Sequence, residues 1–176
     1  NAIFKCAYKL FELEFSALDV PLYHEDCRAW TVSRKGVDIA VFIGDYFARP
    51  SKRSGAWCSA MRSQAKFPKK QIPIVINVCN FSKLENTVLS FDDAKTLFHE
   101  FGHALHQILS DVTYDIISGT SVARDFVELP SQLFEHWLEV PEILEEFATH
   151  CDTGEPLAPD MLSAILEAST YDMGFQ

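Results

Sequence analysis

Residues 90–109, SFDDAKTLFHEFGHALHQIL, carry the strongest helical pattern in the chain and decide how its second half folds. Ser90 is a good N-cap, and Asp92 and Asp93 fall in the first turn, where the helix dipole favours negative charge. Apolar residues then recur at the helical period. The pattern predicts an amphipathic helix that begins after Ser90 and ends near Leu109.

Within this predicted helix, His99-Glu100-Phe101-Gly102-His103 has the pattern HExxH. Histidines four residues apart lie one turn apart on the same face, so both imidazoles can bind one metal ion. Glu100 is rotated by about 100° from His99, beside the ion, where it can accept a proton from bound water. Zinc suits two imidazoles and a carboxylate, with a fourth position open for water. The alternative is two ordinary helix histidines and a surface glutamate.

A third ligand must come from elsewhere in the chain. His106 lies about 10.5 Å along the helix axis from His99, which makes it a poor partner for the same ion. A second helix, predicted from near residue 125 to Leu138, and the residue that follows it offer four acidic candidates: Asp125, Glu128, Glu135 and Glu139. Glu128 has apolar neighbours on both sides, so we expect it to be buried, and a buried acid needs a partner such as a metal ion.

Four segments of the chain resemble the M3 family of zinc oligopeptidases. They are LFHEFGHALHQ (97–107), SGTSVARDFVELPSQLFEHW (118–137), DYFARPSKRSGAW (45–57) and IVINVCNF (74–81). The resemblance implies that His99, His103 and Glu128 are zinc ligands and that Glu100 is the general base.

This resemblance further implies hydrolysis of short peptides, with release of dipeptides as one mode.

A metal-bound histidine normally donates its other ring N–H to a neighbouring group. The candidates for that acceptor are Asp125, Gln132 and Glu135.

Members of the M3 family are much longer than 176 residues and enclose their site between two mostly helical halves. The resemblance therefore implies a catalytic-core fragment that lacks the N-terminal helical half and a downstream loop that contacts the substrate. The alternative function is a non-catalytic or weakly active metal-binding fragment. Apolar surface exposed by such a truncation would favour self-association.

Outside the HExxH helix, the first half of the chain predicts a small β-sheet. Trp30–Val32 and Val37–Ile43 flank the polar turn Ser33–Gly36, which predicts a hairpin. The β-branched run Ile72–Cys79 predicts another strand. Residues 44–71, punctuated by glycine and proline, predict a loop, and residues 1–18 leave helix and strand open.

The second half of the chain predicts further helices at Pro141–His150 and Pro159–Ala168, each with proline at its start. We therefore expect an α+β fold, mainly α, with a zincin-like HExxH helical core. Residues 1–85 would form its β-rich part and residues 86–176 its helical zinc-binding part, together in one compact domain.

Composition narrows the function classes. The chain has 48% hydrophobic and 23% charged residues, which is typical of a globular protein, and its net charge of −10 disfavours nucleic-acid partners. No apolar run is long enough to span a bilayer. Five widely spaced cysteines without a CxxC indicate a reducing compartment, so we expect a cytoplasmic protein.

Residues 49–84 contain eight lysines and arginines and no acid. This basic segment predicts a solvated loop, a surface that docks on acidic parts of the same protein, or a site for substrate carboxylates. Gly55 and Gly119 are expected where the backbone needs a positive φ or a close approach.

Overall fold

The structure is a computed structural model that describes residues 1–83, 88–150 and 152–170. It divides into two compact units, residues 1–138 and 139–176. The predicted boundary between residues 85 and 86 lies in the segment 84–87, outside the described residues. All residues of the candidate site belong to the first unit, so the fold of that unit matters most here.

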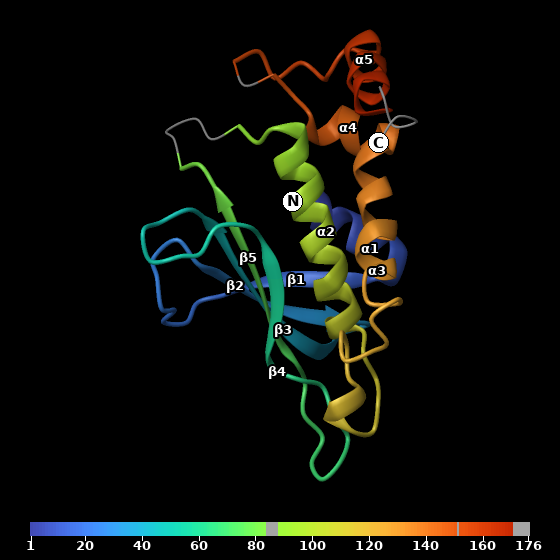
Figure 1. Cartoon of the computed structure of the whole chain (residues 1–176). Coiled ribbons are helices and arrows are strands. Elements are labelled where there is room, and N and C mark those ends of the chain that lie inside the picture. The colour runs from blue at the N-terminus through green and yellow to red at the C-terminus, as the bar shows by residue number, and fades with distance from the viewer. Residues whose placement is uncertain (84–87, 151, 171–176) are drawn as a thin grey trace. The chain divides into compact units, whose positions relative to one another are not determined.

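The first unit is a five-stranded sheet with helices, shown in Figure 1. Its elements in chain order are α1 (Ala2–Phe11), β1 (Leu13–Leu18), β2 (Arg28–Arg34), β3 (Val37–Phe47), β4 (Trp57–Arg62), β5 (Ile74–Phe81), α2 (Phe91–Ile108), the 3-10 turn η1 (Asp115–Ile117) and α3 (Leu129–Glu135). A 3-10 turn, η2 (His136–Glu139), follows α3, and its first three residues belong to this unit. The expected mixed α and β architecture is confirmed.

The strands lie in the order β1-β2-β3-β5-β4. β3 and β5 are parallel, and the other neighbouring pairs are antiparallel. The predicted hairpin is confirmed as β2 and β3, joined at Lys35 and Gly36, which both have positive φ, 52° and 74°. Two such residues are what a tight two-residue hairpin turn requires. β4 lies at an edge of the sheet, which leaves one side of it open.

The prediction of a loop over residues 44–71 is wrong in two places. β3 continues to Phe47, and Gly44 is a close-packed strand position, since a Cβ there would lie 2.4 Å from a Tyr46 ring atom. The second place is β4, which the sequence did not predict, because an edge strand that is mostly exposed lacks a clear alternation of apolar residues. Residues 1–18, left open above, form α1 and then β1.

An aromatic cluster holds α1 and α2 on one face of the sheet. Phe4 of α1 stacks on Phe15 of β1 with ring centroids 4.1 Å apart, and Phe42 of β3 meets Phe101 of α2 at 5.3 Å. Phe42 and Phe101 are fully buried. His99 and His103 are each two residues from Phe101, about 200° around the helix. The core contact therefore turns both histidines away from the sheet.

The opposite face of the sheet has its own apolar layer, made of Ala29, Ile43, Ile76 and Val78. Side chains alternate between the two faces of a sheet along each strand, so consecutive residues within β3, or within β5, belong to different layers. On β5 the side opposite Ile76 and Val78 carries the fully buried Asn77 and Cys79.

The predicted N-terminus of the HExxH helix is confirmed by a capping box. The Ser90 hydroxyl accepts a hydrogen bond from the Asp93 backbone N–H at 3.0 Å, and the Asp93 carboxylate accepts one from the Ser90 N–H at 3.2 Å. Both bonds satisfy backbone donors that the first helical turn leaves free. α2 then runs from Phe91 to Ile108, close to the predicted end.

The second unit contains α4 (Pro141–Phe147) and α5 (Pro159–Thr170), which begin at the predicted prolines.

Three of the four cysteines in the described residues, Cys6, Cys27 and Cys79, are buried and free. Cys151 lies outside the described residues. In the described part of the chain, every helix is too short or too polar to span a bilayer.

Candidate metal centre

His99, His103 and Glu128 converge on one point. Glu128 Oε2 lies 3.2 Å from His99 Nε2 and 3.1 Å from His103 Nε2. One donor atom from each of the three residues lies within 4.8 Å of the others. Metal–ligand bonds of about 2.0–2.1 Å in a tetrahedral zinc site place neighbouring donors about 3.3 Å apart. The spacing of these atoms therefore suits a tetrahedral ion.

A glycine lets the third residue approach the two histidines. A Cβ added to Gly102, in the interior of α2, would lie 2.6 Å from Ser131 Cα and 2.9 Å from the Pro130 carbonyl oxygen. Any side chain at this position would push α3 away from α2. A glycine inside a helix weakens that helix, and this one makes room for the backbone that carries Glu128.

Glu128 itself is placed by a serine, not by burial. The Ser131 hydroxyl, fully buried, lies 3.0 Å from Glu128 Oε2 and 2.9 Å from the Glu128 carbonyl oxygen. The expectation that Glu128 is buried is wrong, because its side chain is 49% exposed. α3 begins only at Leu129, later than predicted, and Glu128 lies at its N-cap position.

A second carboxylate orients the first histidine. Glu135 Oε1 lies 2.6 Å from His99 Nδ1, and Glu135 Oε2 lies 3.4 Å from Lys95 Nζ. Of the three predicted acceptors, the structure brings Glu135 to the histidine, whereas Asp125 and Gln132 are exposed. Since an ionised carboxylate only accepts, the contact has His99 donate through Nδ1, and Nε2 is the ring nitrogen that faces Glu128.

Two polar atoms at this point are left without a protein partner. Glu100 Oε2 and His103 Nδ1 are buried and have no hydrogen-bond partner among the described residues. Burial raises the pKa of the Glu100 carboxyl, with a further contribution from Glu128, against the opposing effect of His99. Burial also lowers the pKa of His103, which favours the neutral imidazole that binds metals.

This donor set fits a divalent cation. Two imidazole nitrogens face one carboxylate oxygen at hydrogen-bond distance, and an ionised carboxylate beside two lone pairs is repulsive unless a proton or a cation lies between them. Two nitrogens and one oxygen are also the ligand types of catalytic zinc sites. The residues present can therefore hold a zinc ion and leave one ligand position open.

The sequence profile of peptidase family M3 matches residues 1–176. This chain belongs to peptidase family M3. It is 40% identical to a dipeptidyl carboxypeptidase of Salmonella typhimurium over 99% of the chain, and 34% identical to oligopeptidase A of Escherichia coli over 97% of the chain. In both cases the chain spans 26% of the length of the relative. The resemblance predicted from the four segments is thereby confirmed.

The M3 chain forms an open cavity of about 380 Å³ beside His99 and Glu100. Its lining residues come from α2, α3 and the segment before β4: Ala56, Asp92, Lys95, Thr96, His99, Glu100 and Glu135. Ala56 was not singled out as a site residue by itself, although Gly55-Ala56-Trp57 lies within one of the four segments. Ala56, the residue before the edge strand β4, thus lines the same cavity as Glu100.

His106 does not join the M3 metal centre. It lines a separate apolar cavity of about 560 Å³, together with Leu105 and Leu109 of α2 and Leu133 of α3. This placement agrees with the axial distance argued from the helix rise. Sequence reasoning missed Ser131, Lys95 and Gly102, and only Gly102, a glycine between the two histidines of the motif, left a signal that could have been used.

Proposed function

We propose that this chain is the zinc-binding, zincin-like core of an M3 oligopeptidase that hydrolyses peptide bonds in short peptides. The observation that carries the proposal is the convergence of His99, His103 and Glu128 beside the buried Glu100. In this proposal the first three residues are the zinc ligands and Glu100 is the general base. The names of the relatives, a dipeptidyl carboxypeptidase and an oligopeptidase, support the same substrate class.

Each protein group has a defined task in this reaction. Bound zinc would polarise the scissile carbonyl and make a bound water acidic enough to lose a proton near neutral pH. Glu100 accepts that proton and passes it to the leaving amine. Its burial, at 7% exposure, raises its pKa towards the range in which a carboxylate can both take up and release a proton.

Other side chains keep the ligands in place. Glu135 accepts the Nδ1–H of His99, which directs the Nε2 lone pair towards the ion. Ser131 holds the carboxylate of Glu128, whose exposed position would otherwise allow several side-chain rotamers. The free cysteines of the described residues support a reducing compartment such as the cytoplasm.

The decisive experiment measures zinc content and peptide hydrolysis on the same samples. We expect about one zinc per chain and chelator-sensitive cleavage of a quenched fluorescent peptide. Glu100→Gln should keep the zinc and lower the rate by about 10²–10⁴-fold, since it removes the general base. His99→Ala and Glu128→Ala should lose the metal.

The same samples test the alternative. Zinc retained in both His99→Ala and Glu128→Ala would reject the ligand set. A zinc-loaded chain that cleaves no peptide would support the non-catalytic metal-binding fragment, which the names of the relatives do not favour. Light scattering over a range of concentrations tests self-association separately.

A further inference from the structure

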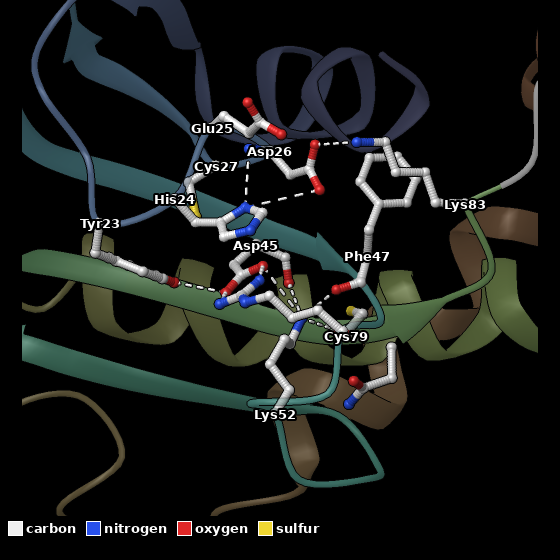
Figure 2. A network of polar contacts seen from close by, with 12 residues as sticks. Tyr23, His24, Glu25, Asp26, Cys27, Asp45, Phe47, Lys52, Cys79 and Lys83 are labelled. Atoms are coloured by element: carbon white, nitrogen blue, oxygen red, sulfur yellow. Dashed lines mark hydrogen bonds and ion pairs between the residues drawn. The ribbon is translucent and has the colours of Figure 1, made fainter.

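A second polar cluster lies on the sheet face turned away from α2 (Figure 2). Its centre is Asp45 of β3, which is paired with Val78 of the outer apolar layer and is only 1% exposed. The Asp45 carboxylate accepts two hydrogen bonds from Arg49, both at 2.7 Å, and one from the Tyr23 hydroxyl at 2.7 Å. This cluster therefore has its negative charge fully enclosed by donors.

Lys52 connects this cluster to the ends of two parallel strands. Its Nζ donates to Asp45 Oδ1 at 3.1 Å, to the Phe47 carbonyl at 2.8 Å and to the Cys79 carbonyl. Phe47 ends β3, and Cys79 lies near the end of β5. The side chain of Lys52 is 5% exposed. A buried ammonium with such partners fixes the residues around it, because every lost contact would leave a buried charge less well satisfied.

Asn80 holds the far end of the same loop. Its side-chain Nδ2 donates to the carbonyl oxygens of Arg53 and Gly55, both at 2.7 Å. Gly55 has a φ of 90°, a conformation that other residues rarely adopt. Residues 49–56 are thus attached at two points to the carboxyl end of β5, through Lys52 and through Asn80.

The residue that follows these anchors lines the cavity beside His99, one of the three converging residues. Ala56 comes directly after Gly55, begins the approach to β4 and lines the 380 Å³ cavity with His99 and Glu100. The anchors lie on one face of the sheet, whereas the cavity lies on the side of α2. The loop therefore connects the two faces, and the hydrogen bonds made by Lys52 and Asn80 on one face fix where Ala56 lies on the other.

Four cations of the basic segment are paired with carboxylates of the same chain. Arg49 and Lys52 are paired with Asp45, and Lys66 and Lys83 with Asp111 and Asp26. These pairs favour contact with acids of the same chain over binding of substrate carboxylates by these four side chains.

We propose that Lys52 and Asn80 are positioning residues for the peptide substrate, because they hold residues 49–56 so that Ala56 keeps its place in the wall of the metal cavity. This inference rests on the proposed function. It assigns to the two residues a role in peptide binding and none in metal binding, since neither touches His99, His103 or Glu128.

The test separates contact with the metal from contact with the cavity wall. Acetohydroxamate reaches only the metal, whereas a peptidyl hydroxamate also extends along the wall that contains Ala56. On the full zinc-loaded chain, Asn80→Ala should weaken the peptidyl hydroxamate about tenfold, the effect of two lost hydrogen bonds, and leave acetohydroxamate within about twofold. Amide exchange in residues 53–57 should become about tenfold faster, with zinc content unchanged.

Lys52→Met should weaken binding of the peptidyl hydroxamate more than Asn80→Ala does. If Lys52→Met does not fold, Asn80→Ala alone decides the test. Lys66→Met, which removes a lysine with an exposed ion pair in the same basic segment, is the matched control and should match wild type.

Equal weakening of both hydroxamates in Asn80→Ala, or of neither, would overturn the positioning role. A wild-type chain that binds neither hydroxamate would reject the proposed function as well, and this result differs from failure of the positioning role alone, in which wild type binds both.

Discussion

Two clusters of charged side chains in residues 1–138 differ in whether their charges are balanced from within. The Asp45 cluster contains a carboxylate, a guanidinium, an ammonium and a phenol, and each of these groups has a hydrogen-bond partner in the others. The cluster at His99 instead brings a carboxylate to two imidazoles, and within residues 1–83, 88–150 and 152–170 it leaves Glu100 Oε2 and His103 Nδ1 without partners.

The difference separates a structural network from a site. A satisfied buried network needs nothing from outside and makes one backbone arrangement favourable. A set of converging donors that leaves buried polar atoms unsatisfied needs a ligand to complete it. Exposure agrees with this distinction, since Asp45 is 1% exposed and Glu128 is 49% exposed. Variants of the Asp45 cluster should therefore change mainly stability, and variants of the metal centre mainly metal binding.

The largest effect should come from removing the charge at the centre of the satisfied cluster. Asp45→Asn leaves the ammonium of Lys52 and the guanidinium of Arg49 without their counter-charge, which should destabilise the chain by about 3–5 kcal/mol. Urea denaturation in the presence of a chelator measures this change, and zinc content measured without chelator should stay at the wild-type level.

Asp111→Asn is the control for Asp45→Asn. It removes a carboxylate whose side chain is 78% exposed and paired with Lys66, so the cost should stay below about 1 kcal/mol. Equal costs for the two variants would show that enclosure of Asp45 adds nothing to stability.

A smaller effect is expected at the second carboxylate of the metal centre. Glu135→Gln weakens the hydrogen bond that orients His99 and should lower zinc affinity by about 10–100-fold. Competition with a chromophoric chelator measures the affinity. Asp125→Asn, at an exposed acid close to Glu128 in sequence, should leave it unchanged, and a similar loss in both variants would contradict an orienting role for Glu135.

The smallest effect is the acid sensitivity that Asp45 contributes. Burial by itself would raise the pKa of this carboxyl, but hydrogen bonds from Arg49, Tyr23 and Lys52 outweigh burial and hold the pKa well below its usual range. The folded pKa is thus below the unfolded value of about 3.9, so the stabilisation is complete above that pH and is lost as the pH falls below it.

Wild type should therefore lose stability between pH 4 and lower pH by at most about 1.4 kcal/mol per pH unit through this group. Urea midpoints measured with chelator at a series of pH values should show a shallower acid decline for Asp45→Asn. Parallel declines would mean that Asp45 has the same pKa in the folded and unfolded chains.

Local patterns predicted the parts of the fold that depend on neighbours in sequence. The capping box at Ser90, the HExxH helix and the hairpin turn at Gly36 each involve residues within four positions of one another. β4 could not be predicted in this way, because an edge strand is half exposed and its apolar residues need not alternate. The burial expected for Glu128 failed for a related reason, since apolar neighbours in sequence do not say which side of the chain faces the core.

The sequence alone determined that two imidazoles share one face of a helix with a glutamate beside them, because the helical period sets those positions. It also determined the family, through segments spread over most of the chain. The tertiary structure alone decided how α3 approaches α2 at Gly102, which of several carboxylates orients His99, and how Lys52 reaches the carbonyl of Cys79, 27 residues away. These contacts join residues far apart in the chain, and packing between whole elements, not local propensity, sets their distances.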